Sequence, residues 1–376
     1  MPKIQMVDLR GQYHKIRREI DRSVKDVLVS AQFINGPKVQ EFETNLANYL
    51  DSKHVIPCGN GTDALQIAMM ALGLKPGDEV IVPSFTYVAT VEVAVLLGLS
   101  PVMIDVDKNT FNVTAEIIEQ AINAHTRAIV PVHLFGQSAD MEPLMKIAEK
   151  YNLQIIEDNA QSIGTEYTFS DGTKKKTGNI GHIGCISFYP AKNLGAYGDA
   201  GAITTQNDEL ADKIRRIANH GQSEKYHHKY IGLNSRLDAI QAAILDVKLK
   251  YLDEYVAARQ TVADYYDKAF ADIDLLQTPE RLPQSTHVFH QYTLIVKDGH
   301  RDALKNFLHE RGIPSMIYYP IPLNEQEAFK GRGRKVGDLP ITKSLCASVL
   351  SLPVHTEMTD DQLEYIVETI QAYFKS

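Results

Sequence analysis

The sequence has 376 residues, of which 44% are hydrophobic and 23% charged, and its formal net charge is −8. This balance is typical of a globular chain with a full hydrophobic core, and the acidic surface argues against nucleic acid or a membrane as a partner. Cys58, Cys185 and Cys346 lie far apart and form no CxxC pair, so neither a disulfide framework nor a zinc site is indicated.

The first 20 residues, MPKIQMVDLRGQYHKIRREI, lack the uninterrupted apolar stretch of a signal peptide. No later run approaches the ~18 apolar residues that a membrane helix needs. We therefore expect a cytoplasmic protein.

From residue 54 onward, short apolar runs alternate with helical patterns. The runs are continuous and rich in β-branched residues, as expected for strands buried on both faces of a sheet. They are His54–Cys58, Glu79–Pro83, Pro101–Asp105, Ala128–Val132, Gln154–Asp158, Ile183–Phe188 and Ala202–Thr205. The helical patterns between them are Asp63–Leu72, Val88–Leu97, Thr114–Ala124, Met141–Tyr151 and Glu209–Asn219. The alternation predicts an α/β fold with a mostly parallel, seven-stranded sheet and helices on both faces.

After Gly221 the pattern changes. Residues 236–271 are typical of a long helix that can contain a break. A mixed region follows, with a strand at Gln291–Val296, a helix at Arg301–Arg311, a Pro-rich stretch at Tyr318–Leu323 and a helix near Asp360–Phe374. We predict a large domain over residues 1–250 and a smaller α+β C-terminal domain over residues 251–376.

Residues 58–65, CGNGTDAL, follow a predicted strand and open a helix. Free N–H groups at a helix N-terminus, with glycines that permit close approach, suit a phosphate. A plain N-cap by Asn60 or Thr62 explains the same residues and is favoured when this stretch is taken alone. Neither GxxxxGK[ST] nor GxGxxG is present, so no standard nucleotide fingerprint applies.

Asp158 ends a predicted strand in the stretch IIEDNAQ. In open α/β sheets, ligands bind at the carboxyl ends of the strands. A carboxylate there can pair with a protonated ring nitrogen, because such a pair favours both charged forms. An N-cap for a following helix is an equal alternative.

Lys192 lies in the Gly-rich stretch SFYPAKNLGAYGDAG between two predicted strands. A lysine on a loop at a strand end can enter a cleft, where desolvation or a neighbouring cation makes its amine nucleophilic. A surface lysine is the alternative, although a merely exposed loop does not need glycines on both sides. A phosphate cup, a carboxylate and a loop lysine, in this order, are the parts that a pyridoxal 5′-phosphate (PLP) site requires.

The chain resembles the DegT/StrS family of PLP-dependent nucleotide-sugar aminotransferases over nearly its whole length. The resemblance rests on GNGTDAL, PSFTYVAT, EDNAQS, SFYPAKNLGAYGDAGA, HGQ, NSRLDAIQAAIL and YYPIPLNEQ. It implies the aspartate-aminotransferase-like (type I) PLP fold. It also implies PLP or pyridoxamine phosphate (PMP) as cofactor and a homodimer with shared active sites.

The resemblance further implies roles for single residues. Lys192 would hold the cofactor as an imine and move protons, Asp158 would pair with the pyridine nitrogen, and Gln161 would lie near the ring hydroxyl. The remaining predicted cofactor contacts are Gly61, Thr62 and Ser187 at the phosphate, Tyr87 stacked on the ring, and Asn234 reaching the phosphate from the partner subunit.

Within the family, the chain is most similar to enzymes that aminate UDP-2-acetamido-2-deoxy-3-oxo-glucuronate in surface-polysaccharide synthesis. This implies a keto-sugar nucleotide as acceptor and L-glutamate as donor. Arg236 would grip the sugar carboxylate in bidentate fashion, with an interface salt bridge as an equal alternative. Tyr318 and Tyr319 are predicted substrate contacts. Tyr318 stands where many relatives have His, which leaves the exact sugar open.

The sequence argues against two rival functions and against a metal site. Family members that dehydrate deoxysugars have His where Lys192 stands, so Lys192 favours transamination. A PLP-sensing regulator would need a DNA-binding domain, and no basic helix-turn-helix precedes residue 50. His220, His227 and His228 crowd one segment, but no Cys or suitably spaced carboxylate completes a ligand set, so we expect no metal.

Overall fold

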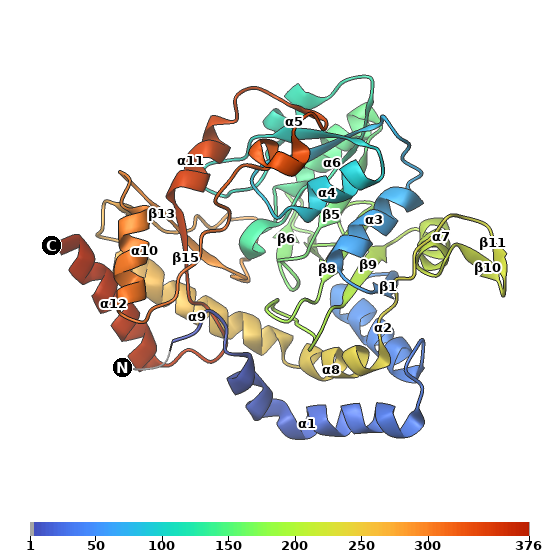
Figure 1. Cartoon of the computed structure of the whole chain (residues 1–376), viewed down its shortest axis with the longest axis horizontal. Helices are drawn as coiled ribbons and strands as arrows, with labels where there is room; N and C mark the ends of the chain where they lie inside the picture. Colours follow the sequence, from blue (N-terminus) through green and yellow to red (C-terminus); the bar gives the residue numbers. More distant parts are fainter. Residues whose placement is uncertain (1–3, 376) are drawn as a thin grey trace.

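The computed structural model describes residues 4–375, and its centre is an eight-stranded sheet (Figure 1). The strand order is β1-β9-β8-β5-β4-β2-β3-β14. The bounds are β1 His54–Cys58, β2 Glu79–Pro83, β3 Ser100–Ile104, β4 Thr126–Ile129, β5 Gln154–Asp158, β8 Ile183–Ser187, β9 Gly201–Thr205 and β14 Arg334–Lys335. Only β9 runs against its neighbours, so the prediction of a mostly parallel sheet is confirmed.

All seven predicted strands are present, and β14 is an eighth that periodicity did not indicate. Its Arg334 donates two hydrogen bonds to the carboxylate of Glu79 on β2, at 2.9 and 2.8 Å. This bidentate pair reaches across β3 and fixes the C-terminal part of the chain to the edge of the sheet.

Helices cover both faces of the sheet, because successive side chains of a strand point to opposite sides. Val80 and Val82 of β2 pack with α3, α4 and α7, whereas Ile81 packs with α5 and α6 on the other face. These helices are α3 Gly61–Ala71, α4 Ala89–Leu96, α5 Ala115–Ala121, α6 Met141–Tyr151 and α7 Asp208–Ala218. Small hairpins join β6 Glu166–Thr168 to β7 Lys174–Lys176, and β10 Gln222–Glu224 to β11 His227–His228.

The long helix predicted over residues 236–271 is two helices, α8 Ala239–Leu249 and α9 Leu252–Phe270. The N-terminal helices α1 Leu9–Ser30 and α2 Pro37–Leu50, which the sequence analysis did not identify, pack against α8 (Figure 1). Nearly every residue of α8 is buried, so this helix lies between the N-terminal helices and the loops of the sheet.

The C-terminal elements have a hydrophobic core of their own around a three-stranded antiparallel sheet. The elements are β12 Leu276–Gln277, β13 Tyr292–Val296, α10 Arg301–Glu310, β15 Val349–Leu352 and α12 Asp360–Lys375. Helix α11 Pro340–Ser348 instead packs into the core on the α5 and α6 side of the large sheet. Short 3₁₀ turns lie at Leu134–Gly136, Leu323–Glu325 and Glu327–Phe329. The division at residue 250 stays a prediction. Across residues 4–375, no helix has the length and apolar character to cross a membrane.

Candidate active site

Asp158 is the last residue of β5 and lies buried at the carboxyl edge of the sheet. Its Oδ1 accepts the N–H of Ala160 at 3.1 Å, and it forms no ion pair within residues 4–375. Burial raises the pKa of Asp158, while this hydrogen bond and the charges of Lys192 and His133 act in the opposite direction. Residues 159–164 form turns rather than a helix, so the N-cap alternative for Asp158 is wrong.

The preceding residue, Glu157, anchors this strand end from the opposite side. Its carboxylate accepts the backbone N–H groups of Gly178 and Gly181 at 2.9 and 2.6 Å, and it contacts His133 Nε2 at 2.8 Å. Because His133 Nδ1 accepts the N–H of Ala139, Nε2 is the nitrogen that carries the proton. Burial alone would raise the pKa of Glu157, but the bonds from His133 and the two glycines hold it below its ordinary value.

Lys192 lies on the loop that connects β8 to β9, and its side chain is half-buried. The backbone N–H of Lys192 donates to the carbonyl of Tyr189 at 2.8 Å. Burial lowers the pKa of Lys192 to about 8, while the charge of Asp158 acts to raise it. The amine and the carboxylate are therefore close enough for their charges to interact, and part of the amine is neutral near physiological pH.

Gly61 and Ser187 meet where α3 begins. A Cβ added to Gly61 would lie 2.7 Å from Ser187 Cβ and 3.3 Å from Ser187 Oγ, so this position admits only glycine. Asn60 caps the helix by accepting the N–H of Asp63 at 2.8 Å. The first N–H groups of a helix have no acceptor within it, so those of Gly61 and Thr62 stay available. The N-cap and the anion cup are thus compatible.

Gln161 and Tyr319 form a hydrogen bond although they lie 158 residues apart in the sequence. Gln161 Oε1 accepts the N–H of Phe135 at 2.8 Å, and its Nε2 donates to the hydroxyl of Tyr319 at 3.1 Å. The half-buried Tyr318 lies beside Tyr319, with ring centroids 6.0 Å apart. The Pro-rich stretch is thereby held against the carboxyl edge of β5.

Tyr87 reaches the same place from the loop after β2. Its ring centroid lies 6.4 Å from that of Tyr319, and 57% of the side chain is exposed. Ser84 ties the two segments together, because its hydroxyl donates to Asn324 Oδ1 at 2.8 Å. An exposed ring at this rim is available to a ligand; stacking by Tyr87 stays a prediction.

Asn234 and Arg236 lie beside the start of α3. Between them, Ser235 donates to Asp63 Oδ2 at 2.6 Å and accepts the N–H of Gly59 at 2.9 Å. Asn234 is exposed, and Arg236 donates to Asn219 Oδ1 at 3.3 Å without a carboxylate partner in the described chain. Both side chains therefore have capacity for a ligand or a second subunit, and their predicted roles stay predictions.

His290 is a buried residue near Lys192 that the sequence analysis did not identify. Its Nδ1 is buried without a hydrogen-bond partner in residues 4–375. Burial, followed by the charges of Lys192 and Arg259, holds the pKa of His290 well below its ordinary value, so the ring is neutral. The only sequence signal was a second His three residues after His287, which does not distinguish a wall of the site from a core position.

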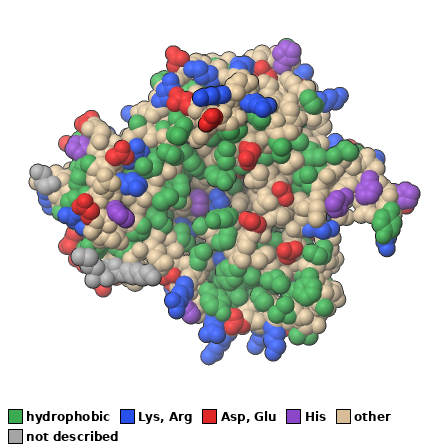
Figure 2. Space-filling model, in the orientation of Figure 1, with side chains coloured by type: hydrophobic (Ala, Val, Ile, Leu, Met, Phe, Trp, Pro, Cys, Tyr) green, Lys and Arg blue, Asp and Glu red, His purple; other side chains and the backbone are tan. Residues whose placement is uncertain are grey.

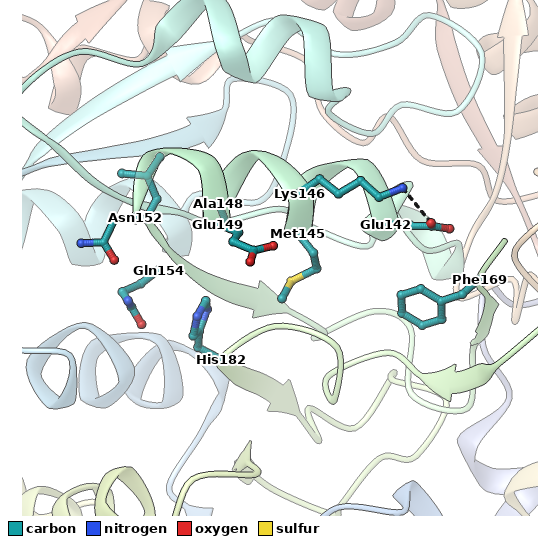
Figure 3. Close-up of a pocket in the computed structure, with 10 residues that line it drawn as sticks. Glu142, Met145, Lys146, Ala148, Glu149, Asn152, Gln154, Phe169 and His182 are labelled. Atoms are coloured by element: carbon teal, nitrogen blue, oxygen red, sulfur yellow. Dashed lines mark hydrogen bonds and ion pairs between the residues drawn. The ribbon is translucent and has the colours of Figure 1, made fainter. Parts of the chain in front are cut away.

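Two hollows differ in what lines them. Figure 2 shows a recess near the middle of one face, with histidine and Lys or Arg side chains at its floor. A cavity of ≈ 510 Å³ lies elsewhere, lined by Met145, Lys146, Gln154 and His182 among others (Figure 3). Gln154 is the first residue of β5, so this cavity lies at the end of the strand opposite Asp158 and contains none of the predicted site residues.

A family model described as the DegT/DnrJ/EryC1/StrS aminotransferase family matches residues 14–371. The chain is 44% identical over 363 residues to UDP-2-acetamido-2-deoxy-3-oxo-D-glucuronate aminotransferase of Pseudomonas aeruginosa, covering 96% of this chain and 98% of that protein. It is also 44% identical over 374 residues to the pleiotropic regulatory protein of Geobacillus stearothermophilus, covering 99% of each. Other relatives are named as transaminases of dTDP-linked amino sugars.

Solved structures show the same fold. NtdA from Bacillus subtilis, determined with bound cofactor PMP, superposes with a TM-score of 0.90 at 32% identity. The match covers 100% of this chain and 85% of that one.

Proposed function

The chain belongs to the DegT/DnrJ/EryC1/StrS aminotransferase family, and on that premise we propose that it transfers the amino group of L-glutamate to a keto-sugar nucleotide. It is a PLP-dependent enzyme, as its family and its PMP-bound structural neighbour show. The finer proposal, UDP-2-acetamido-2-deoxy-3-oxo-glucuronate as acceptor, rests on the 44% identical relative of that name.

The observation that carries the proposal is the placement of Asp158 and Lys192: Asp158 ends β5, and Lys192 lies on the loop after β8, the strand that pairs with β5. The charges of the two groups act on each other. The surrounding residues fit the cofactor. The N–H groups of Gly61 and Thr62, with Ser187, suit the phosphate, and Asp158 suits a protonated ring nitrogen because it has no ion-pair partner in residues 4–375. Bound there, PLP supplies an electron sink for a carbanion next to the amino nitrogen.

The protein's own residues then orient and move protons. Asp158 keeps the ring nitrogen protonated, and Gln161, fixed by Phe135 and Tyr319, presents its amide to the ring side of the site. Lys192 takes a proton at Nζ and returns it, because a pKa of about 8 allows one amine to act as both base and acid near neutrality.

Arg236 is the proposed contact for a sugar carboxylate. It has no carboxylate partner in the described chain, and a guanidinium binds a carboxylate through two parallel hydrogen bonds. We further propose a homodimer in which Asn234 reaches the phosphate of the partner's cofactor, since Asn234 is exposed next to the start of α3. Synthesis of surface polysaccharide in the cytoplasm is the proposed setting.

The cofactor site is tested by saturating the protein with PLP, reducing it with borohydride and mapping the adduct by mass spectrometry. The adduct belongs on Lys192. Lys192→Ala should lose all transaminase activity and still bind PMP. An unmodified Lys192 in the reduced wild-type protein, or activity in Lys192→Ala, contradicts the proposal.

The acceptor is tested with L-glutamate and a panel of keto-sugar nucleotides, with products identified by mass spectrometry. Arg236→Gln should raise KM at least tenfold for acceptors with a sugar carboxylate and leave KM for uncharged acceptors within threefold, because it removes one charge-assisted contact of about 1.5–3 kcal/mol. An equal change for both classes would assign Arg236 to the subunit interface instead.

A further inference from the structure

Lys248 on α8 is a buried lysine that has no anionic partner within residues 4–375. Its side chain is 1% exposed, its Nζ donates to the carbonyl of Gly195 at 2.5 Å, and it lies 5.2 Å from the ring centroid of Tyr197. Among the described residues, the charged group that acts on it is Arg259, itself buried; burial and this repulsion lower the pKa of Lys248 to about 7. An apolar side chain would fill this buried position without removing an amine from water, so packing alone does not explain a lysine there.

A second side chain of α8 binds the same loop. Gln241 stands seven residues before Lys248, hence on the same face of the helix. Its Oε1 accepts the N–H of Tyr197 at 2.9 Å, and its amide nitrogen lies 2.9 Å from where a Cβ on Gly198 would be. One helix face thus satisfies a carbonyl and an N–H of the loop that carries Lys192.

The loop has little freedom at the point where Lys248 holds it. Gly195 lies three residues after Lys192, and a Cβ there would come within 2.2 Å of the carbonyl of Pro190. On the other side, Asn193 donates to the carbonyl of Val288 at 2.9 Å. The backbone that follows Lys192 is therefore held by hydrogen bonds at residues 193, 195 and 197, and the side chain of Lys192 projects from this fixed segment.

We propose that Lys248, with Gln241, is a positioning residue that fixes the loop of Lys192 and thereby sets where the reactive amine stands. The role rests on the proposed function of Lys192. The terminal donor of Lys248 reaches the carbonyl of Gly195 at 2.5 Å, three residues after Lys192. Since α8 begins three residues after Arg236, the same rigid helix links the lysine loop to the proposed substrate contact.

The test compares Lys248→Met, which removes the donor, with Lys248→Gln, which keeps a donor without a charge. Lys250→Met is the control, because Lys250 is exposed on the same helix end. Hydrogen exchange of residues 188–198 is measured in the cofactor-free protein, together with thermal unfolding, the absorption spectrum after PLP addition, and kcat and KM for L-glutamate.

Lys248→Met should speed exchange in residues 188–198 at least tenfold, alter the pH at which the bound-PLP spectrum changes, and lower kcat at least tenfold with KM within threefold. Its unfolding temperature should stay within a few degrees of wild type, because removing the buried amine relieves its desolvation and offsets the lost bond to the carbonyl of Gly195. Lys248→Gln should retain most of the loop protection, and Lys250→Met should match wild type in every readout.

Wild-type exchange and kcat in Lys248→Met would overturn the proposal. Equal losses in Lys248→Met and Lys248→Gln would overturn it as well, since the donor would then not be the operative feature. If Lys248→Met does not fold, Lys248→Gln decides, and its failure to fold assigns Lys248 to global stability. A wild-type protein without an adduct at Lys192 would instead refute the proposed function.

Discussion

Replacing Asp158 by Asn should lower the pKa of Lys192 further. Burial brings that pKa from 10.5 to about 8, and the carboxylate of Asp158 is the one group that opposes the shift. Asparagine keeps the size of the side chain but removes its negative charge, so the ammonium form loses its stabilising partner. Deprotonation becomes easier, and the titration of Lys192 moves to lower pH.

The magnitude follows from the neutral fraction of the amine. At pH 7, an amine with a pKa of about 8 is neutral in roughly one molecule in ten, whereas an ordinary lysine with a pKa of ~10.4 is neutral in roughly one in 2500. At pH 7, Lys192 should therefore react a few hundred times faster than a lysine of the same intrinsic nucleophilicity with an ordinary pKa. Asp158→Asn should increase the neutral fraction beyond one in ten.

The assay is trace labelling of the cofactor-free protein with acetic anhydride between pH 6 and 11, read peptide by peptide by mass spectrometry. The labelling rate of Lys192 against pH gives its midpoint, and the exposed Lys250 in the same sample serves as the internal reference. Asp63→Asn is the matched control, because Asp63 does not act on the titration of Lys192. A wild-type midpoint near that of Lys250, or an upward shift in Asp158→Asn, would refute the reasoning.

Three further changes have defined outcomes. Gly61→Ala places a methyl group 2.7 Å from Ser187 Cβ, so PLP affinity in equilibrium dialysis should fall at least tenfold, and an unchanged affinity would contradict a phosphate site at this helix start. Glu157→Gln turns an amide group toward backbone donors and should cost about 2–4 kcal/mol in urea unfolding at pH 7. Since the folded pKa of Glu157 lies below its unfolded value of ~4.3, the wild-type advantage is complete above that value and is lost as pH falls through the folded pKa. Tyr319→Phe removes one hydrogen-bond partner of Gln161 and should lower the free energy of unfolding by about 1 kcal/mol. An unchanged midpoint in urea unfolding would show that this hydrogen bond does not contribute to stability.

The sheet could be predicted from the sequence because its strands are buried on both faces. Such strands read as continuous β-branched runs, and all seven runs became strands. β14 could not be found in this way, because its two residues join the sheet through the tertiary bond between Arg334 and Glu79. α1 was missed for a related reason: its buried positions are only Gln12, Ile16, Ile20 and Val27 over 22 residues, which leaves a thin apolar stripe.

The site was predictable where function depends on chain order and not where it depends on distant partners. Asp158 and Lys192 follow adjacent strands, so their proximity could be inferred from the sheet alone. Glu157 depends on backbone N–H groups at residues 178–181, and Lys248 depends on a carbonyl 53 residues away. Composition and periodicity do not reveal these backbone partners, and from the sequence alone Lys248 resembles an ordinary lysine at the end of a helix.

The residues proposed to bind the cofactor and those proposed to bind the substrate are positioned in different ways. Gly61, Asp158 and Lys192 are placed by strands of one sheet, so their geometry follows from the core of the fold. Arg236 and Tyr319 come from segments outside the sheet, held by Ser235 and Gln161 respectively. Residues in those segments can change without disturbing the strands, so exchanging residue 236 or residues 318–324 between relatives, with Asn234 kept, should alter acceptor preference while PLP affinity stays within a few-fold. A parallel loss of PLP affinity would show that the two parts of the site are not independent.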